Sequence, residues 1–424
     1  MKVFKFGGAS INNAERIKNI SGILKSYQDE KILVVISAMG KTTNALEKVV
    51  EAFYKGEKEE ALQLFENVKQ VHLNLANELL KQPVNQINDF FTEVEWLLHD
   101  KPVKDPDYYY DQIVCAGELL SSSIVSAFLH SEKIKNIWID VRDIVRTDDN
   151  FRDANVDLGF TQNKINEISI PAFDTTNIVV TQGFIGSTDE NESTTLGREG
   201  SDYTAALFAN MMNAESLTIW KDVEGVMNAD PKEFGDAKFI NALSYDEVIE
   251  MAYYGAQVIH PKTIKPLQNK NIPLYVRCFL NPDAEGTIIS NKNVHQLPPI
   301  IVLKQNQVLI NLNSKDFSFV GEKPMSRLYE IFAELKIKPN LTQNAAISIL
   351  ICMDDHHEKI EKLALKASEI FDVQMEKNLT LLTIRHYNTN IINKLSKDKT
   401  IVLEQKTKDT IQMLMKRLDQ SKRY

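Results

Sequence analysis

Short apolar runs alternate with helical patterns through the first half of the chain. Five runs, bounded by polar or glycine-containing turns, fit β-strands: 2–6, 31–38, 136–141, 178–185 and 216–220. Helical patterns at 11–25 and 41–56 follow the first two of them. Strands separated by helices in this way predict a mostly parallel sheet with helices on both faces. We therefore expect an α/β domain.

A long helical stretch, residues 57–130, separates the second and third predicted strands. Its patterns are "EKEEALQLFENVKQVHLNLANELLKQ" and "YYYDQIVCAGELLSSSIVSAFLH". An insertion of this length between neighbouring strands can form a lid or a wall of a substrate site.

The pattern changes character near residues 290–300, where the chain turns polar and carries paired prolines. We place a domain boundary there, between a catalytic domain at 1–292 and a smaller region at 300–424. Beyond the boundary we expect small α+β modules with antiparallel sheets, two in tandem. Predicted strands are 301–313, 346–354, 379–387 and 399–405, and predicted helices are 325–337, 358–371, 389–396 and 408–418.

Composition narrows the class of protein. The 424 residues are 43% hydrophobic and 25% charged, which is typical of a globular protein with two or more domains. The net charge of −9, with basic residues scattered among acidic ones, argues against nucleic acid as a partner. Three distant cysteines indicate a reducing compartment, and no stretch approaches the roughly 20 apolar residues of a membrane span. We expect a cytoplasmic protein, not bound to a membrane, whose basic tail 415–424 is a solvated helix end.

Three familiar phosphate-binding motifs are absent from the sequence. "AMGKTTN" at 38–44 contains Gly-Lys-Thr, but Val35 stands where a P-loop requires its first glycine. The HRD and DFG triplets of protein kinases do not occur, and "GGASIN" lacks the last glycine of a dinucleotide fingerprint. A phosphate site in this chain would have to be built differently.

The ends of the first two predicted strands carry residues that suit an anion site. Lys5 precedes Gly7 and Gly8, whose missing Cβ atoms let backbone N–H groups approach a phosphate at a helix start. "VISAMGKTTN" repeats the arrangement with Ser37 and Thr43 as hydroxyl donors. Each segment alone also fits a structural turn or a helix cap.

Arg198 lies in a more specific segment, "TTLGREGSDYTAALFANMM". Ser201 and Asp202 follow it and can cap a helix. An arginine at this place can bind a substrate carboxylate, and Asp202 or Glu118 can bind an ammonium group, which suits a zwitterionic ligand. A capped helix with a surface arginine is the alternative. The loop 221–232 carries charges of both signs and fits a nucleotide site or a solvated loop.

Eight segments, taken in order, resemble the motifs of the aspartokinases in the amino-acid kinase family. They are "KFGGAS", "VISAMGKTTN", "YYDQIVCAGELLS", "TQGFIGST", "TTLGREGSDYTAAL", "WKDVEGVMNADPK", "YGAQVIHPKT" and "NPDAEGTII". Eight ordered matches are far more specific than any single one. The resemblance covers essentially the whole chain and implies an amino-acid kinase fold. It also implies phosphorylation of the β-carboxylate of L-aspartate by ATP, which opens the route to lysine, threonine and methionine.

The resemblance also implies roles for individual residues. Lys5 would stabilise the phosphoryl group in transfer, and Asp202 would orient that lysine. Aspartate would be held by Thr43, Glu118, Arg198 and Ser201. ATP and its phosphates would be bound by Lys5, Gly7, Gly8, Ser10, Ser37, Lys221, Asp222, Met227, Lys232 and Gln257. Mg²⁺ would arrive on the ATP phosphates without a metal site of the protein's own, and His260 would be structural because a carboxylate nucleophile needs no base.

Five positions depart from the commonest pattern of that family. Ala9 replaces a threonine, Glu199 a glycine, Lys221 a threonine and Met227 a tyrosine, and Gln257 stands where many members have a phosphate-contacting lysine. We hypothesise that Lys221, Lys232 or Lys262 restores the missing charge.

The region 300–424 resembles the paired ACT modules that bind feedback amino acids in this family. It is too short for two full βαββαβ modules, and we expect the second to lack a helix and a strand. Where lysine-sensitive relatives have an acidic residue and hydroxyl groups, this chain reads "KIKPNLTQNAA", and neither Asn340 nor Gln343 is charged. We predict weak or absent inhibition by lysine, with the modules serving mainly to pack a homodimer.

Two other hypotheses remain open at this point. A glutamate or acetylglutamate kinase would share the catalytic fold, although the helical insertion and the ACT-like tail disfavour it. A decayed kinase acting as an amino-acid sensor would explain Ala9 and Gln257, although a sensor has no use for a phosphate lysine such as Lys5.

Overall fold

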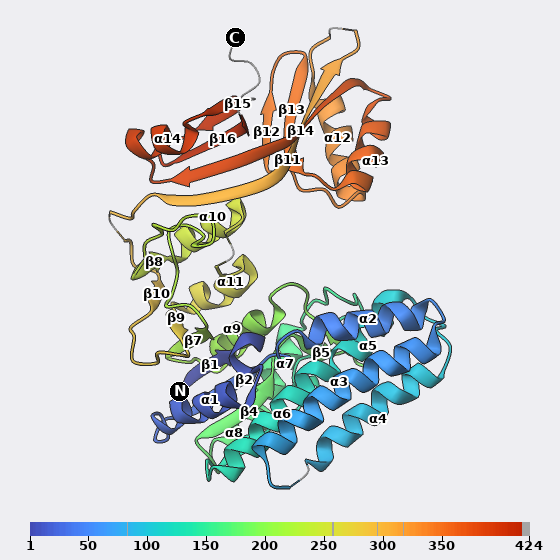
Figure 1. The fold of residues 1–424 in the computed structure, drawn as a ribbon, viewed down its shortest axis with the longest axis vertical. Helices are drawn as coiled ribbons and strands as arrows, with labels where there is room; N and C mark the ends of the chain where they lie inside the picture. The colour runs from blue at the N-terminus through green and yellow to red at the C-terminus, as the bar shows by residue number, and fades with distance from the viewer. Residues whose placement is uncertain (83, 257, 295, 317, 418–424) are drawn as a thin grey trace. The chain divides into compact units, whose positions relative to one another are not determined.

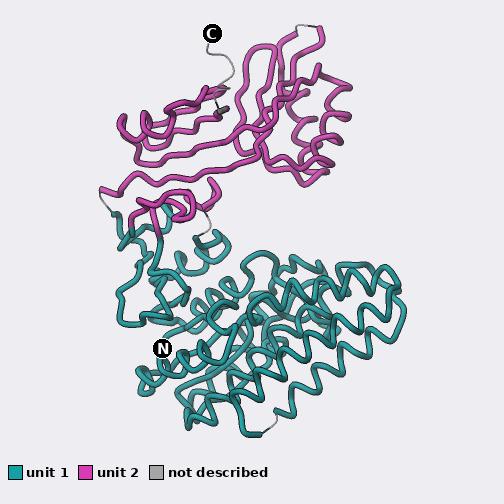
Figure 2. The backbone as a smooth tube through the Cα atoms, viewed as in Figure 1, with its two compact units in different colours: residues 1–226, 239–249, 258–294 teal, residues 227–238, 250–257, 295–424 magenta. Residues whose placement is uncertain are grey.

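The computed structural model describes the chain except residues 83, 257, 295, 317 and 418–424. The chain forms two compact units, coloured separately in Figure 2. Unit 1 comprises 1–226, 239–249 and 258–294, and unit 2 comprises 227–238, 250–257 and 295–424. The last segment of unit 2 begins inside the boundary that we placed at 290–300. Two short segments that we expected in the catalytic domain, 227–238 and 250–257, belong to unit 2 instead.

Unit 1 is built on an eight-stranded sheet in the order β3-β4-β2-β1-β7-β9-β10-β8 (Figure 1). Neighbouring strands are parallel except β9 and β10, which pair antiparallel. The strands are β1 (Lys2–Phe6), β2 (Ile32–Ile36), β3 (Asn136–Trp138), β4 (Ile178–Gln182), β7 (Ser216–Lys221), β8 (Ala242–Ser244), β9 (Leu274–Cys278) and β10 (Thr287–Ser290), with a separate hairpin of β5 (Ile185–Ser187) and β6 (Ser193–Thr195). The predicted α/β class with a mostly parallel sheet is confirmed.

The helices of unit 1 include the predicted insertion, which consists of α3 to α6. They are α1 (Ala14–Lys25), α2 (Thr42–Tyr54), α3 (Lys58–Leu79), α4 (Asn85–His99), α5 (Pro106–Val114), α6 (Ala116–Ser131), α7 (Leu158–Lys164), α8 (Ile170–Ala172), α9 (Gly200–Met211) and α11 (Pro261–Lys270), and α10 (Tyr245–Tyr254) has residues in both units. By length and composition alone, one stretch, Pro106–Ser131, is long and apolar enough to cross a membrane. Of its apolar window, 89% is buried inside the protein, as in a core helix.

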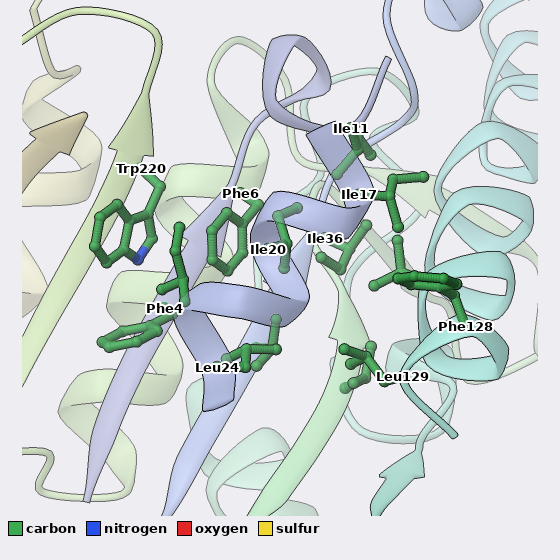
Figure 3. Close-up of a cluster of buried hydrophobic side chains, with 14 of the residues drawn as sticks. Phe4, Phe6, Ile11, Ile17, Ile20, Leu24, Ile36, Phe128, Leu129 and Trp220 are labelled. Carbon is green, nitrogen blue, oxygen red and sulfur yellow. The ribbon is translucent and has the colours of Figure 1, made fainter. Parts of the chain in front are cut away.

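The two faces of the central sheet differ, and the difference places Lys5. Side chains of a strand alternate between the faces of a sheet, so Phe4 and Phe6 point to one face and Lys5 to the other. Phe4 and Phe6 lie in a buried cluster with Trp220 and with apolar side chains of α1 and α6 (Figure 3). Helix α9 packs against β1, β2 and β7. Lys5 is therefore directed away from the cluster and is free to meet a polar residue of α9.

Unit 2 contains a six-stranded antiparallel sheet in the order β12-β13-β11-β14-β16-β15 (Figure 1). Its two central strands, β11 (Ile300–Ser314) and β14 (Phe371–Arg385), have 15 residues each and extend through both halves of the sheet. The other elements are α12 (Glu322–Glu334), β12 (Leu341–Asn344), β13 (Ser348–Asp354), α13 (His357–Ala367), α14 (Thr389–Ser396), β15 (Lys399–Lys406) and β16 (Thr410–Arg417). The order from β11 to β14 is that of a full βαββαβ module, whereas α14 alone lies between β14 and β15.

The predicted helix at 408–418 is wrong, because Thr410–Arg417 forms strand β16, paired with β14 and β15. Ile411, Met413 and Met415 are buried in one apolar cluster, whereas Leu414 is buried in another. This alternation of every second residue is the period of a strand. The interpretation of the tail as a helix end is wrong for 415–417, and 418–424 lie outside the described residues.

Candidate active site

The candidate site lies at the carboxyl ends of four neighbouring strands, β4, β2, β1 and β7. Their carboxyl ends are in register, since Phe6 pairs with Ile36 and with Trp220, the residue before the last of β7, and Ile36 pairs with Gln182. The loops that follow these strands, together with the start of α9, carry most of the predicted site residues. This edge of a parallel sheet is where α/β proteins usually bind their ligands.

Lys5 and Asp202 form a buried ion pair at this edge. Lys5 Nζ lies 2.6 Å from Asp202 Oδ1, and the two side chains are 12% and 5% exposed. Asp202 lies in the first turn of α9, on the face of the sheet to which Lys5 points. The carboxylate thus holds the ammonium group beside a helix N-terminus, whose dipole favours a bound anion.

Gly7 and Gly8 allow the loop after β1 to approach its surroundings closely. A Cβ atom at Gly8 would lie 2.6 Å from the carbonyl oxygen of Ala38, so a side chain would collide with the loop after β2. The N–H of Gly40 donates to the carbonyl of Gly8 over 3.0 Å, which joins the two loops. A Cβ atom at Gly7 would lie 3.4 Å from Nζ of Lys5. The ammonium group therefore lies beside bare backbone, as a phosphate cradle requires.

The predicted hydroxyl groups differ in their surroundings. Ser10 is buried, and its Oγ donates to the carbonyl of Trp220 over 3.2 Å. The structure thus shows the Ser10 hydroxyl bonded to β7, and its contact with phosphate stays a prediction. Ser37 is 9% exposed, directly after β2. Thr43 is partly exposed in the first turn of α2, whose N-cap is Lys41 rather than a threonine.

Glu118 is a buried carboxyl group behind the loop after β2. It lies in the first turn of α6 and is 3% exposed. Its Oε1 accepts a hydrogen bond from the N–H of Ala38 over 3.3 Å, whereas Oε2 has no hydrogen-bond partner among the residues that the structure describes. Burial raises the pKa of Glu118 to about 8, and the charge of Lys5 acts in the opposite direction. A buried oxygen without a partner suits a ligand that brings a donor or a positive charge.

Arg198 is exposed in residues 196–199, which we call the arginine loop. Gly197 and Glu199 have positive φ angles of 74° and 56°. This conformation is uncommon for a residue with a side chain and costs about 1–2 kcal/mol. Glu199 Oε2 accepts a hydrogen bond from the N–H of His260 over 2.8 Å. Glycine at this position would avoid the strain but would not make the bond.

Asp111 is a residue of this region that the sequence did not lead us to single out. It is fully buried in α5 and accepts hydrogen bonds from the N–H and hydroxyl of Thr195, over 2.8 and 2.7 Å, and from the N–H of Arg152 over 3.0 Å. Burial raises its pKa to about 6, although these hydrogen bonds favour the charged form. Asp111 therefore anchors the chain just before the arginine loop. A charged residue within the apolar pattern of α5 was the available signal.

The residues predicted to bind ATP are divided between the two units. Asp222 is exposed after β7 in unit 1, whereas Met227 and Lys232 belong to unit 2. Gln257 lies outside the described residues. In the described part of the chain, no group of three His, Cys, Asp or Glu side chains is placed to hold a metal ion. The ammonium group of Lys5 beside the bare backbone of Gly7 suits the phosphates of ATP, on which Mg²⁺ would arrive.

Two of the lysines that we hypothesised to contact phosphate bind protein atoms. Lys221, the last residue of β7, donates from Nζ to the carbonyl of Val258 over 2.8 Å. Lys262 Nζ donates to the carbonyl of Leu196 over 3.1 Å and lies 3.2 Å from Asp153 Oδ1. Both ammonium groups thus have partners within the protein.

Comparisons with known proteins agree on one family. The sequence profile of the amino acid kinase family matches residues 1–278. Lysine-sensitive aspartokinase 3 of Escherichia coli (strain K12) is 31% identical over 399 residues, which cover 90% of this chain and 86% of that protein. Aspartokinase 1, chloroplastic, of Arabidopsis thaliana is 31% identical over 377 residues, which cover 83% of this chain and 63% of that longer protein.

Solved structures extend the likeness to both units. The crystal structure of E. coli aspartokinase III with aspartate and ADP, in the R-state, matches with a TM-score of 0.82 at 27% identity, covering 98% of this chain and 96% of that chain. The structure of the same enzyme with lysine and aspartate, in the T-state, matches with a TM-score of 0.80 at 26% identity. The match covers 98% of this chain and 95% of that chain. The expected amino-acid kinase fold with a C-terminal ACT-like region is confirmed.

Proposed function

Since the chain belongs to the amino acid kinase family, and within it to the aspartokinases, we propose that it transfers a phosphoryl group from ATP to the β-carboxylate of L-aspartate. The observation that carries the proposal is the buried pair of Lys5 and Asp202 at the carboxyl ends of parallel strands. Glu118 adds a buried carboxyl oxygen, Oε2, that has no hydrogen-bond partner among the described residues. The product, 4-phospho-L-aspartate, would feed the synthesis of lysine, threonine and methionine.

The proposed reaction depends on positioning and charge neutralisation rather than on covalent catalysis. The substrate carboxylate is already a nucleophile and needs no general base. Lys5 would neutralise negative charge on the phosphoryl group as it moves, and Asp202 would hold that ammonium group in place. Gly7 and Gly8 would add backbone N–H donors to the phosphates. Mg²⁺ bound to ATP would supply further positive charge there.

Aspartate has one ammonium and two carboxylate groups, which the site can match. Arg198 would bind a carboxylate through paired hydrogen bonds, and Thr43 and Ser201 would add hydroxyl donors. Glu118 would pair with the ammonium group through Oε2, which has no hydrogen-bond partner in the described part of the chain. The remaining predicted contacts to ATP stay proposals: Ser10, Ser37, Lys221, Asp222, Met227, Lys232 and Gln257.

A hydroxamate assay tests the proposed reaction directly. Hydroxylamine traps an acyl phosphate, so we expect hydroxamate to form only when ATP, Mg²⁺ and aspartate are all present. Glutamate and N-acetylglutamate serve as matched substrates, and a higher rate with either would favour the rival kinase hypothesis. Binding of aspartate without turnover would instead favour the amino-acid sensor.

We also propose that lysine inhibits this enzyme weakly or not at all. The side-chain amide of Asn340 accepts a hydrogen bond from Lys304 Nζ over 2.7 Å and donates to Gln307 and Asp354 over 2.8 and 3.1 Å. Both N–H groups of the Asn340 amide are thus used within unit 2, and the side chain has no negative charge to offer a lysine ammonium group. About 10 mM lysine is expected to leave the aspartate-dependent rate within about 20% of its value without lysine. Threonine and methionine, added separately at the same concentration, are the controls. A clear fall in the aspartate-dependent rate with lysine alone would refute the proposal.

Unit 2 is the part through which we propose that the enzyme forms a homodimer in the cytoplasm. The six-stranded sheet of unit 2 leaves apolar side chains exposed: Met375 is 44% exposed and Ile401 is 40% exposed. Burial of such side chains against a second copy would be favourable. A monomer by light scattering at micromolar concentration would contradict this proposal.

A further inference from the structure

One short segment, residues 258–262, is bonded both to the arginine loop and to the end of β7. We propose that Glu199 and Lys221 are positioning residues, which hold this segment in place and so fix the spacing between the aspartate side and the ATP side of the site. The inference rests on the proposed function, because the two sides are defined by the proposed substrates.

Glu199 makes the bond on the aspartate side. Its Oε2 accepts from the N–H of His260 over 2.8 Å, and His260 is the N-cap of α11. Glu199 has a φ of 56° and directly follows Arg198, the residue proposed to bind a substrate carboxylate. A strained backbone with a side chain that reaches another segment indicates that the side chain, rather than the turn, requires this residue.

Lys221 makes the bond on the ATP side. Its Nζ donates to the carbonyl of Val258 over 2.8 Å, and it directly precedes Asp222 in the loop proposed to bind ATP. Lys221 is only partly exposed at the end of β7, a strand of the central sheet. The segment is therefore tied to a rigid element at its first residue and to the arginine loop at its third.

Two further contacts keep the segment from moving as a free loop. Ile259, between the two bonded residues, is 1% exposed. Lys262 Nζ donates back to the carbonyl of Leu196 over 3.1 Å, so the segment and the arginine loop are joined at two points. Movement of the segment would displace the backbone on both sides of Arg198.

Glu199→Gly tests the bond on the aspartate side. Glycine adopts a positive φ without strain, so the variant removes the carboxylate and leaves the turn intact. KM for aspartate is expected to rise about tenfold, KM for ATP to change less than about twofold, and the midpoint of thermal unfolding to stay within about 2 °C of the parent. Glu199→Gln retains an oxygen acceptor for the same N–H and is expected to keep KM for aspartate within about threefold.

Lys221→Met distinguishes positioning from direct contact with phosphate. A lysine that only binds phosphate would change KM for ATP alone, whereas a lysine that positions the segment also raises KM for aspartate, by about fivefold or more. The double variant Glu199→Gly/Lys221→Met is expected to raise KM for aspartate no more than the worse single variant, because either loss frees the same segment. Lys265 is an exposed lysine of α11, so Lys265→Met is the matched control for loss of charge. Its KM values for aspartate and ATP should equal those of the parent.

Three outcomes would overturn the inference: parental KM for aspartate in Glu199→Gly, a Lys221→Met effect confined to ATP, or fully multiplicative effects in the double variant. Each of them leaves aspartate phosphorylation by the parent enzyme intact. Absence of aspartate-dependent turnover in the parent would overturn the proposed function, and this inference with it. The parent enzyme assayed in parallel therefore separates the two failures.

Discussion

Replacing Lys5 by methionine is expected to lower kcat for aspartate phosphorylation about a thousandfold while changing KM for aspartate less than about threefold. The ammonium group would act on negative charge that the phosphoryl group carries during transfer, so its loss affects the chemical step more than aspartate binding. Steady-state ADP release, measured over a range of aspartate concentrations at saturating ATP, separates the two constants.

Stability has to be separated from catalysis in this variant. Lys5→Met leaves Asp202, which is 5% exposed, without its partner, and breaking a buried ion pair costs about 3–5 kcal/mol. Lys5→Met/Asp202→Asn removes both charges and is expected to regain thermal stability but not turnover. Lys2→Met makes the same change on the same strand, where Lys2 pairs with Glu30 over 2.5 Å, and should retain activity. A folded Lys5→Met enzyme with more than about a tenth of the parental kcat would refute the role of Lys5.

The central sheet of unit 1 was predictable because its signals are local. Val34, Val35 and their neighbours in β2 form an unbroken apolar run, as a strand buried on both faces requires. Alternation within β1 also determines that Lys5 and Phe4 face opposite sides. The strand order was not predictable in the same way, because it depends on contacts between residues far apart in the chain, such as Phe6 with Trp220.

The errors in unit 2 have a related cause. Residues 408–418 are rich in methionine, leucine and lysine, which favour helices when considered alone. Pairing with β14, about thirty residues earlier in the chain, overrides this preference: Met413 lies opposite Leu382. β14 itself begins at Phe371, well before the predicted start at 379, because its polar first half is held by pairing with β11 rather than by its own burial pattern.

The sequence allowed candidate site residues to be predicted where one short segment carries the chemistry. The segments around Lys5 and Asp202 identified both residues, and the structure brings them to 2.6 Å. Hydrogen bonds from side chains to backbone atoms of distant segments leave no such signal in the sequence. The hydroxyl of Ser10 is directed to the carbonyl of Trp220, and Lys221 to the carbonyl of Val258, because the folded chain places those acceptors there. The type of a side chain indicates which groups it can bind, but not which backbone atom lies within hydrogen-bond distance of it in the folded chain.

Glu118 should make aspartate binding depend on pH. Burial raises its pKa from 4.5 to about 8, so the carboxyl is mostly protonated at neutral pH when no ligand is bound. Pairing with a substrate ammonium group requires the charged form, and binding therefore releases a proton. KM for aspartate is expected to fall as pH rises, by at most about tenfold per unit, and to level off above about pH 8. The profile should be measured from about pH 6.5 to 9, above the pKa of about 6 for Asp111.

Glu118→Gln should abolish this dependence and raise KM for aspartate about a hundredfold, because the amide cannot pair with an ammonium group. The stability of the folded parent should fall over the pH range in which its binding of aspartate improves. The folded pKa of Glu118 lies above its unfolded value, so the parent loses the contribution of Glu118 to stability as pH rises from about 4.5 through 8, whereas the glutamine variant has no such contribution to lose. Urea unfolding at about pH 6 and 9 measures this difference. Glu132→Gln, at the exposed end of the same helix, is the matched control. A flat pH profile of KM in the parent would mean that Glu118 does not bind the substrate ammonium group, because its protonation would then not compete with binding.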